Sequence, residues 1–502
     1  MKNILLLLLL NTAFIFSQDI HVPIDTIVKT YHETIIKGKK IKYTAETGMQ
    51  PVWDNDGKPI ASLFYTYYKR NLSKDSEIKE SHRPIVISFN GGPGSGSLWM
   101  HIGYTGPRVL KIDDEGFPIQ PYGMKTNPYS IIDTADIVFV CPVNTGYSRM
   151  IADNNGDYPK RETFFGINAD IKYLATWINT FISRKNRWES PKYIIGESYG
   201  GTRVMGLSYE LQSSHWMYLN GVIMVSPADY KLLEFDDGQE DAIDSSLHLP
   251  YYAATAWYHK MLDQEIQSMD LLAFLPQVEE FTINKLIPAI AKGGFISDKE
   301  RDAIAEKYSY YSGLSKEFIL SHNLDVPNNT FWKELLRDRN GLTVGRLDSR
   351  YRGIDKREAG SSPDTNIELN SWNHSFTPAI NYYVRNELKF ETDIKYNVFG
   401  PVHPWDREND NTRENLRKAM AQNPFLKVFI QSGYYDGATN YFQAKYTMWQ
   451  VDPSGKMKDR FYFEGYRSGH MMYLRAEDLK KSNDDLREFI KNSSTNGIPA
   501  KY

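Results

Sequence analysis

Short runs of consecutive apolar residues, separated by stretches with helical spacing, constrain the fold of this chain more than any other feature. A strand that is apolar throughout is buried on both faces, which is typical of a parallel sheet covered by helices. The stretch 166–182 carries apolar side chains at the spacing of one helical stripe. The pattern therefore predicts an α/β chain with a mostly parallel central sheet. The runs lie at 84–89, 137–140, 193–195, 222–225, 428–430 and 461–463.

Two regions depart from this alternation. Residues 27–70 contain β-rich pieces around an Asn55-Asp56-Gly57 turn, which predicts an antiparallel entry to the sheet. Between 231 and 396 the strand signal disappears and helical patterns dominate, which predicts a helical cap inserted between two strands. An independent second domain is the alternative, although no Pro/Gly/Ser-rich linker marks a boundary.

The first residues have the pattern of a secretory signal. Lys2 gives a basic start, an apolar run follows from Ile4 to Phe16, and the chain turns polar after Ser17. The run is shorter than the roughly 20 residues that span a bilayer, although an uncleaved anchor is the alternative. We expect cleavage near Ser17 and an exported, periplasmic or secreted protein without stable membrane insertion. The expected organisation is a signal peptide at 1–17, a first core part at 18–230, the cap at 231–396 and a second core part at 397–502.

Charge and cysteine content exclude several classes of function. The chain of 502 residues has 59 basic and 62 acidic side chains, so no strong positive field favours nucleic acid as a partner. Its single cysteine, Cys141, excludes an intramolecular disulfide and any cysteine-based metal site. The His, Asp and Glu spacing offers no cluster either, so we expect no metal and no organic cofactor. The sequence gives no indication of the oligomeric state.

The motif Gly196-Glu197-Ser198-Tyr199-Gly200 lies directly after a buried strand and before a helix. A serine at a sharp strand-to-helix turn needs small neighbours, so that its hydroxyl projects outward as a nucleophile. The loop at 90–97 has four glycines within six positions and follows another strand. It lacks the lysine of a phosphate-binding loop. We interpret it as an oxyanion-hole loop that donates one backbone N–H, while Tyr199 donates the other.

A serine nucleophile requires a base and a group that orients the base. On an α/β-hydrolase sheet these follow late strands in the order acid, then histidine. Asp436 follows the strand at 428–430, and His470 follows the strand at 461–463. His403 and Asp406, which precede both strands, are the rival pair. We therefore expect an α/β-hydrolase fold with a catalytic triad of serine, acid and histidine.

Together these motifs resemble the serine carboxypeptidase family, peptidase family S10. The resemblance runs from about residue 40 to 486, and residues 187–193 and 251–258 are most similar to its bacterial branch. The motifs that carry it are Asn90-Gly91-Gly92-Pro93-Gly94, Gly106-Pro107, Pro142 to Ser148, Gly196 to Gly200, Asp436 before a glycine, and Gly469-His470-Met471.

The resemblance implies a role for each matched position. Ser198 would be the nucleophile, His470 the base and Asp436 its orienter, with the N–H groups of Gly92 and Tyr199 in the oxyanion hole. Asn90 and Glu197 would bind the C-terminal carboxylate of the substrate. The second acid of that carboxylate site falls at Tyr104, whose hydroxyl can donate to a carboxylate but cannot share a proton in an acid pair.

The leading hypothesis is an exported serine carboxypeptidase that cleaves peptides through an acyl-enzyme intermediate. A second hypothesis keeps the triad but assigns it to an esterase or acyltransferase. A third is a non-catalytic peptide- or partner-binding protein on a hydrolase scaffold.

Overall fold

The computed structural model describes residues 22–73, 76, 78–228, 242–494, 497, 499 and 501. The predicted signal peptide at 1–17 and the predicted start of the cap at 231 lie outside these residues.

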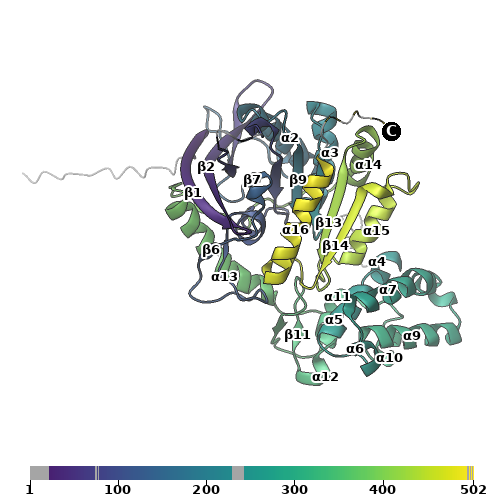
Figure 1. Ribbon diagram of the computed structural model, residues 1–502. Helices are drawn as coiled ribbons and strands as arrows, with labels where there is room; N and C mark the ends of the chain where they lie inside the picture. The colour runs from purple at the N-terminus through teal and green to yellow at the C-terminus, as the bar shows by residue number, and fades with distance from the viewer. Residues whose placement is uncertain are drawn as a thin grey trace, which may run out of the picture.

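A twisted ten-stranded sheet forms the centre of the molecule (Figure 1). Its strand order is β1-β2-β3-β7-β4-β9-β10-β13-β14, with β8 paired to β3. In this order, the six strands β7, β4, β9, β10, β13 and β14 run parallel to one another. Strands β1, β2 and β3 pair antiparallel at one side of them. Both features confirm the predicted fold class. The strands span β1 Thr26–Ile36, β2 Lys39–Trp53, β3 Pro59–Arg70, β4 Ile85–Phe89, β7 Asp136–Val140, β8 Arg149–Met150, β9 Lys192–Glu197, β10 Gly221–Val225, β13 Lys427–Gly433 and β14 Phe461–Tyr466.

Helices cover both faces of the sheet, because alternate residues of each apolar strand point to opposite sides. On β4, Ile85 and Ile87 pack against α2, α3 and α14, whereas Val86 faces the core that includes α16. Cys141, directly after β7, is buried as a strand-end thiol. The helices around the sheet span α1 Leu98–Met100, α2 Ile167–Arg184, α3 Tyr199–His215, α14 Thr412–Gln422, α15 Tyr441–Val451 and α16 Ala476–Ser493.

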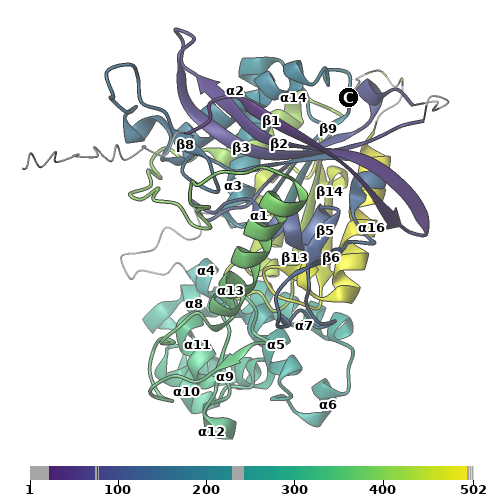
Figure 2. The same cartoon turned by 90° about the vertical axis from the view of Figure 1, so that its left-hand side faces the viewer.

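The helices from α4 to α12, which follow β10, form a lobe with its own apolar core (Figure 2). They span α4 Ala242–Ser246, α5 Leu249–Tyr258, α6 Gln264–Gln267, α7 Leu271–Phe281, α8 Ile287–Ala291, α9 Asp298–Ser312, α10 Lys316–Ser321, α11 Asn328–Glu334 and α12 Arg337–Asn340, and the next helix of the insertion is α13 Ile367–Tyr382. The lobe also contains a two-stranded sheet that the sequence pattern did not predict, β11 Thr343–Val344 with β12 Arg352–Gly353. A second small sheet, β5 Arg108–Leu110 with β6 Met124–Thr126, lies before β7.

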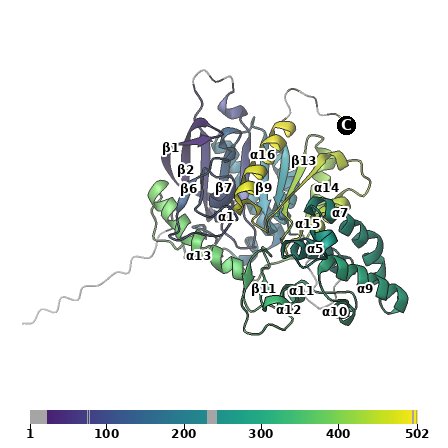
Figure 3. The ribbon, with the colours of Figure 1, turned by 60° about the horizontal axis from the view of Figure 1, so that its bottom comes forward.

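The last part of the predicted insertion packs mainly against the sheet domain, although the start of α13 also contacts the lobe through Glu368 and Trp372. Helix α13 leaves the lobe and runs towards β1 and β2 (Figures 1 and 3). Its side chains Trp372, Phe376 and Ile380 belong to the same core as β7 and α16. The predicted unit 231–396 is therefore divided: its helices up to α12 form the lobe, and α13 covers the sheet domain.

Candidate active site

Ser198 lies at a sharp turn between β9 and α3. Its φ of 59° and ψ of −126° are strained for a residue other than glycine. The turn brings Gly196 so close to Gly200 that a Cβ atom on Gly196 would lie 2.1 Å from the Gly200 carbonyl oxygen. The motif therefore needs glycine at Gly196, as the sequence analysis expects, and the half-buried serine projects from the end of the strand.

The glycine-rich loop after β4 approaches this turn closely. A Cβ atom on Gly91 would lie 2.6 Å from the backbone nitrogen of Tyr199, so the contact requires glycine. Gly92 has a φ of 108°, a conformation that L side chains rarely adopt. Of the two predicted oxyanion-hole residues, Gly92 lines one cavity with Ser198, and Tyr199 follows Ser198 directly in the chain.

Asp436 and His470 are joined as a pair. The Nδ1–H of His470 donates a 2.7 Å hydrogen bond to Oδ2 of Asp436. Asp436 is fully buried, and its other oxygen accepts the backbone N–H groups of Ala438 and Thr439 at 2.9 and 3.1 Å. The Thr439 hydroxyl donates to Oδ2 at 2.8 Å. These donors fix the carboxylate, which in turn fixes the imidazole ring.

The charge on Asp436 also changes the basicity of His470. Burial by itself would lower the pKa of His470, but the carboxylate and its hydrogen bond outweigh burial and raise this pKa above its ordinary value. A more basic imidazole accepts a proton from a serine hydroxyl more readily.

Ser198 and His470 line the same cavity, which has a volume of about 180 Å³. The sheet domain contributes these two residues and the glycine-rich loop. The insertion contributes Arg346 and Leu347, and α13 contributes Trp372. The cavity therefore lies where the sheet domain meets the insertion.

The rival pair lies elsewhere. His403 and Asp406 are exposed and do not line this cavity. One carboxylate oxygen of Asp406 accepts the backbone N–H of Glu408 at 2.8 Å, and its carbonyl oxygen accepts the N–H of Ile167. Asp406 thus stabilises a surface loop.

Glu197 lines the cavity beside Ser198 and is 3% exposed. The side-chain amide of Asn90 donates to one of its oxygens, and the hydroxyl of Tyr473 donates to the other at 2.5 Å. Burial raises the pKa of Glu197 to about 7, despite the opposing effects of His470 and the two donors. Asn90 itself is fully buried and does not line the cavity, so its contact is with Glu197.

The prediction for Tyr104 is not supported by its position. Its ring is fully buried, and its hydroxyl donates to Gln431 at 2.7 Å and to the carbonyl oxygen of Ser482 at 3.3 Å. Its ring stacks on that of Tyr473 with centroids 4.9 Å apart. Because Tyr473 is the ring that reaches Glu197, Tyr104 cannot hold a substrate in the cavity and acts as a packing partner.

A buried ion pair that the sequence analysis missed, between Arg203 and Asp170, lies beside the turn that carries Ser198. Nε of Arg203 donates to Asp170 at 2.7 Å, and its Nη1 donates to the carbonyl oxygen of Asn90 at 2.5 Å. The hydroxyl of Tyr199 also donates to Asp170, at 3.0 Å. Arg203 thus ties α3 to the glycine-rich loop. Its position four residues after Tyr199, on the same helix face, was the available signal.

The segment 346–349 of the insertion bridges the loops that carry Asp436 and His470. Its carbonyl groups accept the backbone N–H of Gly437 at 2.9 Å and that of His470 at 2.6 Å. The N–H of Ser349 donates to the carbonyl oxygen of Tyr435 at 2.9 Å, and Asp348 accepts the N–H of Gly469 at 3.3 Å. The insertion therefore helps to position both the acid and the histidine.

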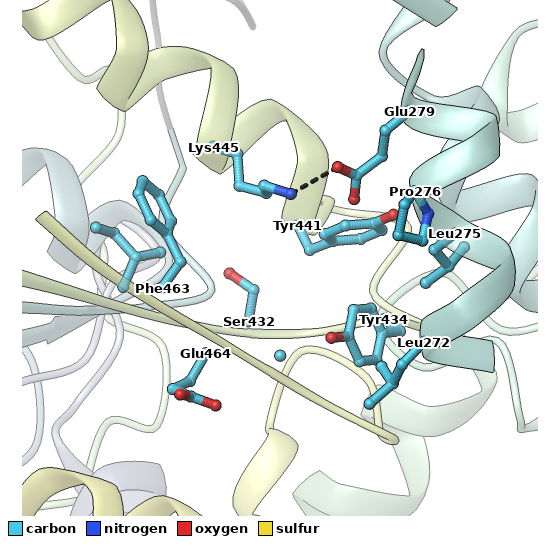
Figure 4. Close-up of a pocket in the computed structure, with 12 residues that line it drawn as sticks. Leu272, Leu275, Pro276, Glu279, Ser432, Tyr434, Tyr441, Lys445, Phe463 and Glu464 are labelled. Carbon is cyan, nitrogen blue, oxygen red and sulfur yellow. Dashed lines mark hydrogen bonds and ion pairs between the residues drawn. The ribbon is translucent and has the colours of Figure 1, made fainter. Parts of the chain in front are cut away.

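A second cavity, of about 290 Å³, lies between α7 of the insertion and the ends of β13 and β14 (Figure 4). An ion pair of 2.6 Å between Lys445 and Glu279 crosses it from core to insertion. The buried hydroxyl of Ser432 points into it and has no hydrogen-bond partner among the described residues. None of the residues predicted for the site lines this cavity.

Within the described part of the chain, no group of three or more His, Cys, Asp or Glu side chains is arranged to hold a metal ion. No helix among those residues is both long and apolar enough to cross a membrane.

Comparison with known proteins agrees with this fold. The sheet, its helices and the serine turn define an α/β hydrolase. Among solved structures, a prohormone-processing carboxypeptidase from Saccharomyces cerevisiae has a similar fold, with a TM-score of 0.51 at 14% identity over 90% of this chain and 93% of that one. The sequence model of the serine carboxypeptidase family matches residues 39–462. The chain belongs to the serine carboxypeptidase family.

Curated relatives are similar over a shorter length. Serine carboxypeptidase-like 36 of Arabidopsis thaliana is 27% identical over 185 residues, which are 36% of this chain and 35% of that protein. The vitellogenic carboxypeptidase of Aedes aegypti is 27% identical over 160 residues, 32% of this chain and 30% of that protein. The chain thus spans about a third of the length of these relatives. Its assignment to a bacterial branch stays a prediction.

Proposed function

We propose that this protein is an exported serine carboxypeptidase, which removes residues from the C-termini of peptides through an acyl-enzyme intermediate. The observation that carries the proposal is the His470–Asp436 pair, at 2.7 Å, in one cavity with a strained serine turn. Membership of the serine carboxypeptidase family supports a hydrolase that acts on peptide bonds. The apolar N-terminal run supports export.

In the proposed reaction, the Ser198 hydroxyl oxygen attacks the carbonyl carbon of the last peptide bond while His470 takes the hydroxyl proton. The N–H groups of Gly92 and Tyr199 stabilise the negative charge that develops on the carbonyl oxygen. The carbon–nitrogen bond then breaks, and His470 gives its proton to the leaving amine. Water hydrolyses the acyl ester with the same base and restores Ser198.

In the proposed function, Glu197 makes the enzyme selective for the C-terminal ends of peptides. With a pKa of about 7, its carboxyl group is protonated in mildly acidic solution, where it can lie beside a substrate carboxylate without repulsion. Asn90 and Tyr473 position it through hydrogen bonds and need not contact the substrate.

The experiment compares release of the last residue from a peptide with a free C-terminal carboxylate and from the same peptide with a C-terminal amide. The proposal predicts faster release from the free acid below pH 7. Equal rates would contradict recognition of the carboxylate. Hydrolysis of matched esters without peptide cleavage would favour the esterase or acyltransferase hypothesis.

A further inference from the structure

Arg346 is a cation in the catalytic cavity that forms no ion pair within the described part of the chain. Its side chain is exposed and lines the cavity with Ser198 and His470. Arg350, four residues on, is buried and paired with Asp348 at 2.7 Å. Among the described residues, no carboxylate lies within ion-pair distance of Arg346. Arg346 interacts electrostatically with Glu368, one oxygen of which accepts the backbone N–H of Leu347, but the two form no ion pair. The guanidinium can therefore form an ion pair with a ligand.

The backbone of Arg346 is fixed relative to the catalytic residues. Its carbonyl oxygen accepts the N–H of Gly437, next to Asp436, and the following residue, Leu347, accepts the N–H of His470. Because these hydrogen bonds fix the segment, the side chain holds its charge at a defined distance from the reacting bond.

The surroundings of Arg346 favour a carboxylate as its ligand. Besides Arg346, the ionisable side chains that line the cavity are Glu197 and His470, and both have other partners. Trp99, Trp372 and other apolar side chains form much of the remaining wall. A guanidinium offers a fork of N–H donors that matches a carboxylate, and an apolar wall strengthens such a contact.

We propose that Arg346 is a receptor for a substrate carboxylate in the catalytic cavity. Two sources share this chemistry: the C-terminal α-carboxylate, and the side chain of a Glu or Asp next to the scissile bond. In the first case Arg346 takes the role predicted for Tyr104, because the Tyr104 hydroxyl bonds to Gln431 and does not reach the cavity. In the second it makes the enzyme selective for acidic peptides. The inference rests on the proposed action on peptides, and its test is separable from that action.

The test measures binding by calorimetry in a Ser198→Ala background, so that peptides are not consumed. The ligands are acetylated tetrapeptides in three matched comparisons: free acid against amide, penultimate Glu against Gln, and terminal Glu against Gln. The variants add Arg346→Gln or Arg346→Lys. Arg352→Gln is the matched control, since Arg352 is exposed in the same insertion but does not line the cavity.

We expect the parent to bind the carboxylate-bearing peptide at least about tenfold more tightly in one or more comparisons, the range of a charge-assisted hydrogen bond. Arg346→Gln should bring that ratio close to one, Arg346→Lys should retain part of it, and Arg352→Gln should leave it unchanged. The comparison in which Arg346→Gln abolishes the preference identifies which carboxylate Arg346 binds. An unchanged ratio in Arg346→Gln, or a parent without any preference, would overturn the inference. Turnover of the same peptides by the wild type tests the proposed function separately.

Discussion

The backbone N–H of His470 donates a 2.6 Å hydrogen bond to the carbonyl oxygen of Leu347, a residue of the insertion. The candidate base therefore depends on a segment that lies outside the strands and loops of the sheet domain. The same segment contacts the loop of Asp436 through Gly437 and Tyr435. The insertion is thus part of the framework that holds the acid and the histidine together.

This contact predicts the effect of a small change beside it. A Cβ atom on Gly469 would lie 2.4 Å from the Leu347 carbonyl oxygen and 2.5 Å from Cβ of Asp348. Gly469→Ala should therefore displace His470 and lower kcat by about a hundredfold, because misplacement by about 1 Å has effects of this size. Steady-state kinetics on a peptide substrate measures the loss. Gly294→Ala is the control, since no atom lies within 4 Å of the Cβ it would add. Equal kcat values for the two variants would show that the contact does not position His470.

The Asp436→Asn variant should lower kcat by several orders of magnitude, because the amide no longer orients the imidazole or stabilises its charge. Asp436 also raises the pKa of His470 against the effect of burial. Its removal should therefore lower that pKa and move the acidic limb of the kcat profile to lower pH. Asp406→Asn, at an exposed position, should change neither the rate nor the profile. A large loss in Asp406→Asn with near-normal Asp436→Asn would reverse the assignment of the acid.

Glu197 predicts a pH dependence that is specific to free-acid peptides. Its pKa of about 7 means that it is neutral below pH 7 and ionised above it. The KM for a free-acid peptide should therefore rise as the pH passes through 7, while the KM for the matching amide should not. Glu197→Gln stays neutral throughout, so its KM for the free acid should lose this rise. KM values between pH 5 and 8.5 test this, and a rise that persists in the variant would exclude Glu197 as its source.

The two stacked tyrosines should differ in their effect on Glu197. Tyr473 donates to Glu197, and this hydrogen bond lowers the carboxyl pKa. Tyr473→Phe should therefore raise the pKa and shift the increase in KM to higher pH. Tyr104→Phe should not shift the increase in KM. It should lower the free energy of unfolding by about 1 kcal/mol, because the hydrogen bond to Gln431 is lost. The paired pH profiles provide the measurement. A shift in Tyr104→Phe alone would contradict the assignment of Tyr473 as the tyrosine that lowers the pKa of Glu197.

Much of the fold and the positions of the candidate triad followed from local pattern. The inner strands of the parallel sheet are apolar on both faces, so their runs are visible without knowledge of their neighbours. Ser198 follows β9 and Asp436 follows β13, which are such strands. His470 follows the edge strand β14, whose aromatic run is visible in the sequence although its side chains alternate between half-buried and exposed.

The features that the sequence analysis missed depend on contacts between distant segments. Leu347 acts through a backbone carbonyl group, which leaves no trace in side-chain pattern. Tyr104 and Tyr473 have the same side chain, and only their stacking determines which hydroxyl reaches Glu197. The apolar period of α13 is the same whether it covers the lobe or the sheet, so spacing alone could not assign it to the sheet.

The proposed chemistry depends on Ser198 being an activated nucleophile. Reaction with a phosphonofluoridate, followed by intact mass and peptide mapping, tests this. We predict one adduct on the wild type, located on Ser198, no adduct on Ser198→Ala, and much slower labelling of Asp436→Asn at the same serine. A wild-type protein that remains unmodified, or that is modified at another residue, would show that Ser198 is not the nucleophile.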